Sequence, residues 1–201
     1  MKQLLLGTRN PGKVIEITTI LHSSGWVFSS LQEFANVGPA VEDGVTYAEN
    51  AIAKAQFYAA ATGLWALADD SGLEVAALGG APGVHSARYA GEGASDAERR
   101  ALLLSELAKI DSRDRRARFV AAVAIARPDG GVLNVSHGIC EGTIISEARG
   151  TGGFGYDPLF VPDGYDQTFA ELPDHVKNRI SHRARALLRI RDSLDHLEPA
   201  S

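Results

Sequence analysis

The stretch that most constrains this chain is a short apolar run, residues 64–67, which is soon followed by two adjacent aspartates. The run has the length of a buried strand, and the carboxyl end of a strand faces the usual ligand crevice of an α/β sheet. Asp69 and Asp70 repel each other, so a divalent metal ion, a raised pKa or full solvation must relieve the repulsion. We expect Ser71 and Gly72 to turn the chain tightly. The alternative is a plain turn between two strands.

The N-terminal region predicts a strand and a helix joined by a polar loop. Residues 3–6 read as a buried strand, residues 14–21 as a helix, and residues 7–13 as the loop between them. Backbone N–H groups at such a helix start bind anions, and Lys13 adds a full charge. A P-loop is disfavoured because Val14 stands where that motif needs Ser or Thr. An ordinary strand-to-helix turn is the alternative.

A second helix is predicted from residue 46 to Gly63, because residues 46–49 match a capping box and an alanine-rich run follows. Asn50 and Lys54 are four residues apart, so they share one face of this helix and can reach the same ligand. The alternative for Lys54 is a solvated surface lysine. Glu42, in the loop before the helix, adds another carboxylate.

The remaining pattern alternates short strands, helices and glycine-rich loops. A capping box at Ser95 predicts another helix. Further expected elements are strands at 73–78, 119–126, 132–137 and 139–146, a hairpin turn at 128–131, loops at 79–91 and 150–158, an arginine-rich solvated connector at 113–118, a helix at 175–197 capped by Asp174, and a frayed end at 198–201.

Two aromatic side chains, Phe154 and Tyr156, stand on the second glycine-rich loop. Exposed aromatic surface is costly unless it packs on something, and a flat nucleobase is one suitable partner. Packing back onto the protein's own core is the alternative. The sequence leaves both open.

Composition bounds the class of protein. The 201 residues suit one domain or two intimate lobes, and 45% hydrophobic with 22% charged residues suggests neither disorder nor a membrane span. A net charge of −5 argues against non-specific binding to long nucleic acid. Cys140 is the single cysteine, so no intramolecular disulfide forms. The short apolar start is no signal peptide, and we expect a cytoplasmic protein.

Six motifs, taken together, resemble one enzyme family. The chain is similar to the inosine triphosphate pyrophosphatases, also called house-cleaning dITP/XTP pyrophosphatases. The resemblance spans residues 8–183. The motifs are Thr8-x-Asn10-x-x-Lys13, Glu49-Asn50-Ala51-x-x-Lys54-Ala55, Ala68-Asp69-Asp70-Ser71-Gly72-Leu73, Pro82-Gly83-Val84-x-Ser86-Ala87-Arg88-Tyr89, Gly153-Phe154-Gly155-Tyr156-Asp157-Pro158 and Lys177-Asn178-x-Ile180-Ser181-His182-Arg183.

The resemblance implies an α/β fold with a long central mixed β-sheet flanked by helices. It also implies a single domain over residues 1–201, with two lobes around a nucleotide-binding cleft. The implied reaction is the Mg²⁺-dependent hydrolysis of dITP, ITP and XTP, deaminated purine nucleoside triphosphates, to the monophosphate and pyrophosphate. A homodimer is implied as well, and we expect neither a nucleic acid nor a membrane partner.

The same resemblance implies roles for individual residues. Asp70 corresponds to the catalytic base and metal ligand, with Asp69 as a supporting or alternative acid, and Glu42 is the expected second metal ligand. Donors from Lys177, His182 and Arg183 would select the carbonyl at purine position 6. The substrate-binding set comprises Thr8, Arg9, Asn10, Pro11, Gly12, Lys13, Lys54, Ser71, Phe154, Gly155, Tyr156, Asp157, Lys177, His182 and Arg183.

Two other functions are compatible with parts of the pattern. A related pyrophosphatase acting on other modified nucleotides would hydrolyse methylated pyrimidine triphosphates and not ITP. A non-hydrolysing nucleotide sensor would bind ITP without releasing pyrophosphate. The paired Asp69 and Asp70 disfavour the sensor, because an anion site gains from two acids only when a metal ion bridges them.

Overall fold

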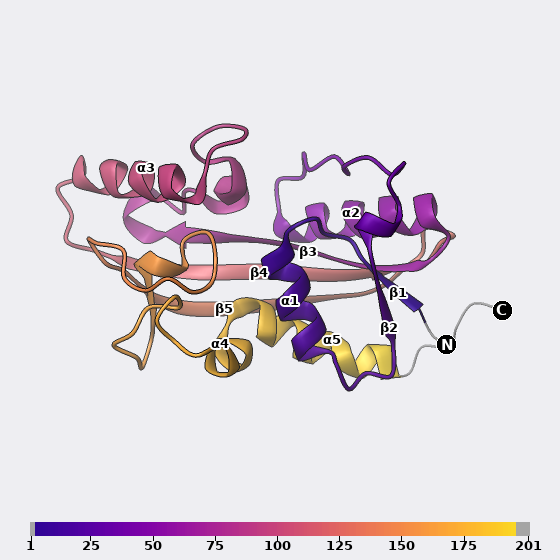
Figure 1. Ribbon diagram of the computed structural model, residues 1–201. Helices are drawn as coiled ribbons and strands as arrows, with labels where there is room; N and C mark the ends of the chain where they lie inside the picture. Colours follow the sequence, from indigo (N-terminus) through magenta and orange to yellow (C-terminus); the bar gives the residue numbers. More distant parts are fainter. Residues whose placement is uncertain (1–2, 196–201) are drawn as a thin grey trace. The chain divides into compact units, whose positions relative to one another are not determined.

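Residues 3–195, which the computed structural model describes, contain six strands in one mixed sheet (Figure 1). The strand order is β2-β1-β3-β4-β5-β6. β1 pairs in parallel with β2 and β3, and β5 pairs antiparallel with β6. The bounds are β1 Gln3–Leu6, β2 Val27–Ser30, β3 Trp65–Val75, β4 Arg116–Ala126, β5 Val132–Ile144 and β6 Phe160–Pro162. The predicted α/β fold with a mixed sheet is confirmed.

The chain folds into two units, each with its own core. Unit 1 comprises residues 3–70, 121–138 and 182–195, and unit 2 comprises residues 71–120 and 139–181. Leucine, isoleucine and two tryptophans fill the core of unit 1, whereas phenylalanine and leucine dominate that of unit 2. β3, β4 and β5 each contribute residues to both units.

Unit 1 carries helices α1 (Pro11–Ile20), α2 (Tyr47–Thr62) and α5 (His182–Asp195). In Figure 1, α1 and α5 lie on one face of its strands and α2 lies on the other. α1 begins three residues before the predicted start, because Asn10 caps it and Pro11 takes the first helical position. The capping box and the left-handed Gly63 end of α2 are as predicted.

Unit 2 carries helices α3 (Asp96–Ala108) and α4 (Asp174–Ile180). The predicted capping box at Ser95 opens α3, and its Leu103 and Leu107 are buried in the unit 2 core. Short 3-10 segments occupy parts of the expected loops at Gly83–Arg88 and Asp157–Leu159, and another, Leu31–Glu33, lies in unit 1. The strand predicted at 73–78 is wrong in its second half, because β3 ends at Val75 and Ala76–Leu78 is a 3-10 segment. The hairpin turn at 128–131 is confirmed, since the N–H of Arg127 donates to the carbonyl of Gly131 at 2.8 Å.

Three further boundaries differ from the predictions. The turn expected at Ser71 and Gly72 is wrong, because β3 continues through them to Val75. The extended pattern predicted at 132–137 and 139–146 is one strand, β5, which ends at Ile144, and the connector expected at 113–118 already enters β4 at Arg116. Ser71 and Gly72 have a high turn propensity, but packing on both faces of β3 overrides that propensity and keeps them extended.

The single helix predicted at 175–197 is two helices. Ser181 separates α4 from α5 with an extended backbone, and Pro173 rather than Asp174 occupies the N-cap of α4. The cores explain the break: Ile180 packs in unit 2, whereas Leu187 packs in unit 1. Residues 196–201, which include the predicted helix end and the frayed tail, lie outside the described residues.

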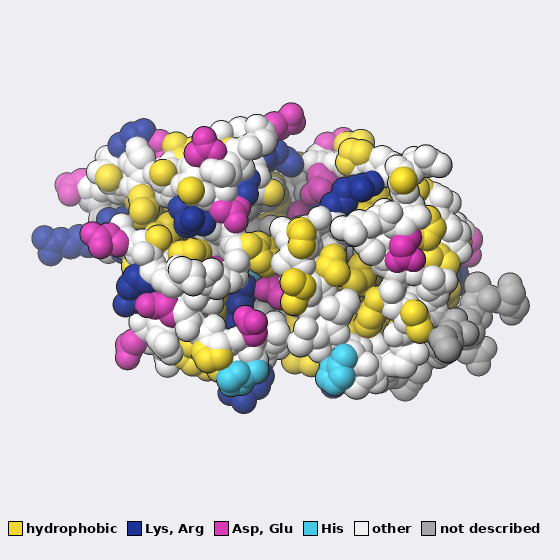
Figure 2. All heavy atoms as spheres, viewed as in Figure 1, with side chains coloured by type: hydrophobic (Ala, Val, Ile, Leu, Met, Phe, Trp, Pro, Cys, Tyr) yellow, Lys and Arg dark blue, Asp and Glu magenta, His cyan; other side chains and the backbone are white. Residues whose placement is uncertain are grey.

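Acidic and basic side chains are interspersed over the face of the molecule in Figure 2. Among residues 3–195, none of the helices has the length and apolarity needed to span a bilayer.

Truncating the inward face of α1 tests this core. Ile17 is 1% exposed, so Ile17→Ala should lower the free energy of unfolding by about 2–5 kcal/mol. Ile15, on the same helix, is 64% exposed, and Ile15→Ala serves as the matched control with little effect. Urea unfolding measures both, and equal losses would contradict the assigned helix face.

Candidate active site

The β1–α1 loop is held by its own polar side chains. Asn10 accepts hydrogen bonds from the N–H groups of Gly12 and Lys13 at 2.9 and 3.2 Å, and its own N–H donates to Thr8 Oγ1 at 3.2 Å. Arg9 donates to the carbonyl of Val37 at 2.5 Å. The amides expected to be open to an anion at Gly12 and Lys13 are therefore capped by Asn10. An incoming phosphate has to compete with that cap.

Asp69 is buried and lies in a network of opposite charges. Its Oδ2 is 3.0 Å from Lys13 Nζ and accepts a hydrogen bond from Arg183 Nε at 3.0 Å. Arg183 Nη1 in turn donates to Glu16 Oε2 at 2.5 Å. Burial by itself would raise the pKa of Asp69, but Lys13 and Arg183 outweigh it and hold that pKa well below the usual range. Asp69 is consequently a fixed anion and a weak base.

Asp70 points to the opposite face of the strand and has different partners, because successive side chains of a strand alternate. Asn50 Nδ2 donates to its Oδ2 at 3.0 Å, and Lys54 Nζ lies 3.6 Å from its Oδ1. Lys54 also bonds Glu42 at 3.1 Å. Burial raises the pKa of Asp70, and the nearby ammonium groups offset this only in part. Of the two neighbours, Asp70 is the stronger base.

The acids around Lys54 have the chemistry of a Mg²⁺ site. Among residues 3–195, no group of three or more metal-binding side chains occurs, but Mg²⁺ commonly uses only one or two carboxylates and takes its other ligands from water and phosphate. Glu42 and Asp70 come from different segments and already share one cation, the ammonium group of Lys54. This donor set fits a hard divalent cation.

The glycine-rich loop at 150–158, in unit 2, leaves the Phe154 ring partly exposed and buries the Tyr156 ring. Tyr156 is 4% exposed and packs in the unit 2 core, where its hydroxyl donates to the carbonyl of Ser86 at 3.0 Å. Phe154 is only partly buried. Core packing therefore accounts for Tyr156 and leaves Phe154 as the aromatic surface of the loop.

A buried ion pair contacts both the ring and the backbone of Phe154. Lys177 Nζ lies 2.5 Å from Asp157 Oδ2 and 5.0 Å from the centre of the Phe154 ring. The same carboxylate accepts the N–H of Phe154 at 2.9 Å. Lys177 is 4% exposed and Asp157 is 3% exposed. The predicted residues 154–157 and Lys177 thus form one connected group within unit 2.

The other predicted residues fall in different environments. His182 and Arg183 are buried at the start of α5 in unit 1, and Ser71 is partly buried in β3. Arg183 is 2% exposed, with its guanidinium bonded to Asp69 and Glu16. Its expected contact with a purine base stays a prediction, as does that of His182.

Two further side chains contact the predicted site residues. Glu16 joins the buried network through Arg183, although its place on α1 gave no sequence signal. Asn50 bonds Asp70 and also accepts the N–H of Gly44 at 2.8 Å, which ties the acidic loop to the strand. The four-residue spacing from Lys54 was the signal for Asn50.

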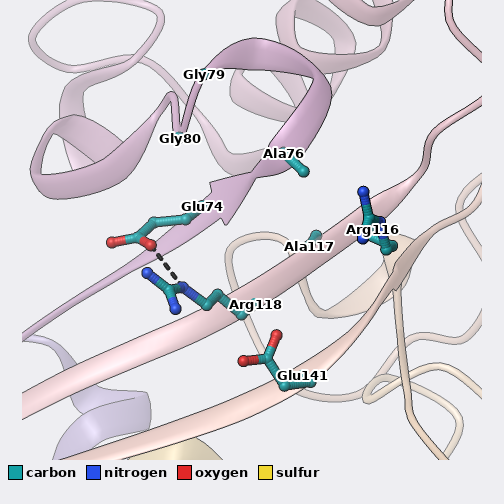
Figure 3. Close-up of a pocket in the computed structure, with 8 residues that line it drawn as sticks. All are labelled: Glu74, Ala76, Gly79, Gly80, Arg116, Ala117, Arg118 and Glu141. Carbon is teal, nitrogen blue, oxygen red and sulfur yellow. Dashed lines mark hydrogen bonds and ion pairs between the residues drawn. The ribbon is translucent and has the colours of Figure 1, made fainter.

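A hollow elsewhere in unit 2 holds none of the predicted site residues (Figure 3). Its charges compensate one another, because Arg118 donates to Glu74 at 2.7 Å. The lining residues are Glu74, Ala76, Gly79, Gly80, Arg116, Ala117, Arg118 and Glu141.

Comparisons with known proteins agree with the family that the six motifs indicate. The model of the Ham1 family matches residues 4–193. A dITP/XTP pyrophosphatase of Desulforamulus reducens is 50% identical over 195 residues, which cover 97% of this chain and 96% of that protein. A dITP/XTP pyrophosphatase of Thermus thermophilus is 50% identical over 92% of this chain and 88% of its own length.

Solved structures agree with these matches. A HAM1 protein from Coxiella burnetii has a TM-score of 0.88 at 43% identity, with coverage of 98% of this chain and 100% of that one. A nucleoside-triphosphatase / dITP/XTP pyrophosphatase from Mycobacterium abscessus has a TM-score of 0.74 at 41% identity, with coverage of 94% and 98%.

The charge on Asp69 makes acid stability a test of the network. Because its folded pKa is depressed, its stabilisation is complete above the unfolded pKa of about 3.9 and is lost as the pH falls below it. Asp69→Asn should therefore flatten the decline of the unfolding free energy between about pH 5 and pH 3. Urea unfolding across this range measures the slope, with Asp129→Asn in the exposed hairpin turn as control. A slope equal to that of the wild type would contradict the network.

Proposed function

The chain belongs to the Ham1 family, and from this membership we propose that it hydrolyses dITP, ITP and XTP to the monophosphate and pyrophosphate. Relatives named dITP/XTP pyrophosphatases, 50% identical along nearly the whole chain, support this function. The observation that carries it in this chain is the contrast between two adjacent acids. Asp69 is neutralised by two cations, whereas Asp70 is kept basic.

Unit 1 binds the triphosphate. Triphosphate hydrolysis depends mainly on positioning and on charge neutralisation, with little covalent work for the protein. Lys13 and Lys54 supply two ammonium groups, and the capped loop from Thr8 to Gly12 supplies polar groups beside them. Asp69 holds Lys13 by an ion pair at 3.0 Å and favours its charged form, although burial lowers the pKa of that ammonium group.

Asp70 orients and deprotonates the attacking water. The water oxygen forms a bond to the α-phosphorus, the bond from that phosphorus to the bridging oxygen breaks, and pyrophosphate leaves. Asp70 accepts the proton of the water, a task favoured by its raised pKa. Asn50 fixes the carboxylate by donating to the oxygen that does not face Lys54.

Asp70 and Glu42 would hold the Mg²⁺ ion. When bound, such an ion supplies positive charge to the phosphate oxygens. Lys54 lies 3.1 Å from Glu42 and 3.6 Å from Asp70, so its ammonium group is placed beside both carboxylates and can pair with a phosphate oxygen.

Residues of unit 2 bind the base. Phe154 supplies the stacking surface, and Lys177 beside it is a cation able to donate to the carbonyl at purine position 6. Adenine presents an amino group there, and a buried donor left unpaired costs about 1–3 kcal/mol. That one nucleotide engages the groups of both units stays a prediction, as do base contacts by His182 and Arg183.

The homodimer is implied by the resemblance, whereas the location and the absence of a nucleic-acid partner are inferred from the N-terminal residues and the net charge. We retain a homodimer, a cytoplasmic location and the absence of a nucleic-acid partner as predictions. Size-exclusion chromatography with light scattering tests the first directly.

Replacing the proposed base tests the assignment. Asp70→Asn should lower kcat by about 10²–10⁴-fold, the range for a lost general base, with an unchanged circular dichroism spectrum. Asp43→Asn, in the exposed acidic loop, is the matched control and should keep full activity. Retention of most activity in Asp70→Asn with normal Mg²⁺ dependence would refute the role of Asp70.

Pyrophosphate release tests the function as a whole. The purified protein is incubated with ITP, XTP, GTP and ATP, in Mg²⁺ or in EDTA. We expect fast release from ITP and XTP in Mg²⁺, little release from ATP, and none in EDTA. Absence of release from every nucleotide would refute the proposed function.

A further inference from the structure

The peptide groups of Gly155 are held from both sides by one helix. Asp96 Oδ2 accepts the N–H of Gly155 at 2.7 Å, and Arg100 Nη1 donates to its carbonyl at 2.7 Å. Gly155 has φ +62°, a left-handed conformation that other residues rarely adopt. The backbone is thus fixed at the bend of the loop that carries Phe154.

Asp96 and Arg100 together form a clamp on the backbone of Gly155, and their spacing in the sequence makes this possible. Asp96 and Arg100 are four residues apart in α3, so they lie on the same face of the helix and reach the two peptide groups that flank the Cα of Gly155. Arg99 pairs with Asp96 and donates to the carbonyls of Ala87 and Ala94 at 2.8 and 2.6 Å. These bonds anchor Asp96 to the chain before α3. The clamp is therefore built on rigid, capped structure.

The loop is held at consecutive peptides. Asp157 accepts the N–H of Phe154, and Asp96 accepts the next N–H, that of Gly155. Hydrogen bonds to charged groups are about twice as strong as neutral ones. The backbone on both sides of the Phe154 side chain is therefore restrained, whereas the ring itself stays partly exposed.

We propose that Asp96 and Arg100 are positioning residues that set the affinity for the nucleobase by holding the Phe154–Gly155 backbone. The inference rests on the proposed function, in which this loop binds the base. Neither side chain has to touch the nucleotide. A preorganised loop loses less conformational entropy on binding, so releasing the clamp weakens base binding.

The test separates base binding from phosphate binding. Asp96→Asn removes the charge that holds the Gly155 amide, and KM for ITP and the inhibition constant of inorganic triphosphate are measured with Mg²⁺. We expect KM to rise about tenfold, equivalent to about 1.4 kcal/mol. The inhibition constant should stay constant, because inorganic triphosphate has no base, and kcat should change much less than KM.

Two further variants provide a matched control and a second test of the clamp. Glu106→Gln makes the same change on the same helix at a residue paired with Lys109, and should leave KM unchanged. Arg100→Gln removes the other half of the clamp while the Asp96–Arg99 pair remains, and should also raise KM. It replaces Asp96→Asn if thermal melting shows that variant to be unfolded.

Each outcome decides the proposal. An unchanged KM in both clamp variants overturns it, and so does a parallel rise of KM and the triphosphate inhibition constant, which indicates general damage. An active wild type with these results leaves the proposed function intact. A wild type that releases no pyrophosphate from ITP overturns both.

Discussion

The alternation of side chains along β3 is the constraint on which the candidate site depends. Asp69 and Asp70 are neighbours in the chain, but the pleat directs them to opposite faces of the strand. Asp69 meets cations from α1 and α5, whereas Asp70 meets an amide and an ammonium from α2. Mutual repulsion is relieved by this separation, and each carboxylate acquires a different basicity. Two chemically identical residues thereby stand in two different electrostatic environments.

The buried charges also determine how the helices of unit 1 pack. Removing a carboxylate from water costs several kcal/mol, so a buried Asp69 requires cations at hydrogen-bonding distance. Lys13 meets this need from α1 and Arg183 from α5, and Glu16 balances the second positive charge of the network. These pairs demand that α1 and α5 lie on the same face of the strands. The arrangement that stabilises the fold is also the one that leaves Asp70 available as a base.

Charged side chains also determine the conformation of the glycine-rich loop at 150–158 in unit 2. Its glycine-rich loop would lose much conformational entropy on ordering, and it is restrained by charged side chains that bond its backbone. Asp157, paired with Lys177, accepts the N–H of Phe154, and Asp96 and Arg100 bind the N–H and the carbonyl of Gly155. Hydrophobic packing of Tyr156 completes the support. Only the Phe154 ring is left as accessible aromatic surface, which suits a stacking role.

The sequence by itself determined the features that depend on neighbouring residues. Capping boxes mark the starts of α2 and α3, apolar runs mark most strands, and the six motifs indicate the family. The local turn signal at Ser71 was misleading, because β3 continues through it. The break between α4 and α5 at Ser181 had no sequence signal. Long-range packing decides both features. The partners of Asp69 and Asp70 likewise depend on contacts between residues up to 114 positions apart. Only the tertiary structure could assign them, since a sequence does not reveal which face of a strand each helix will cover.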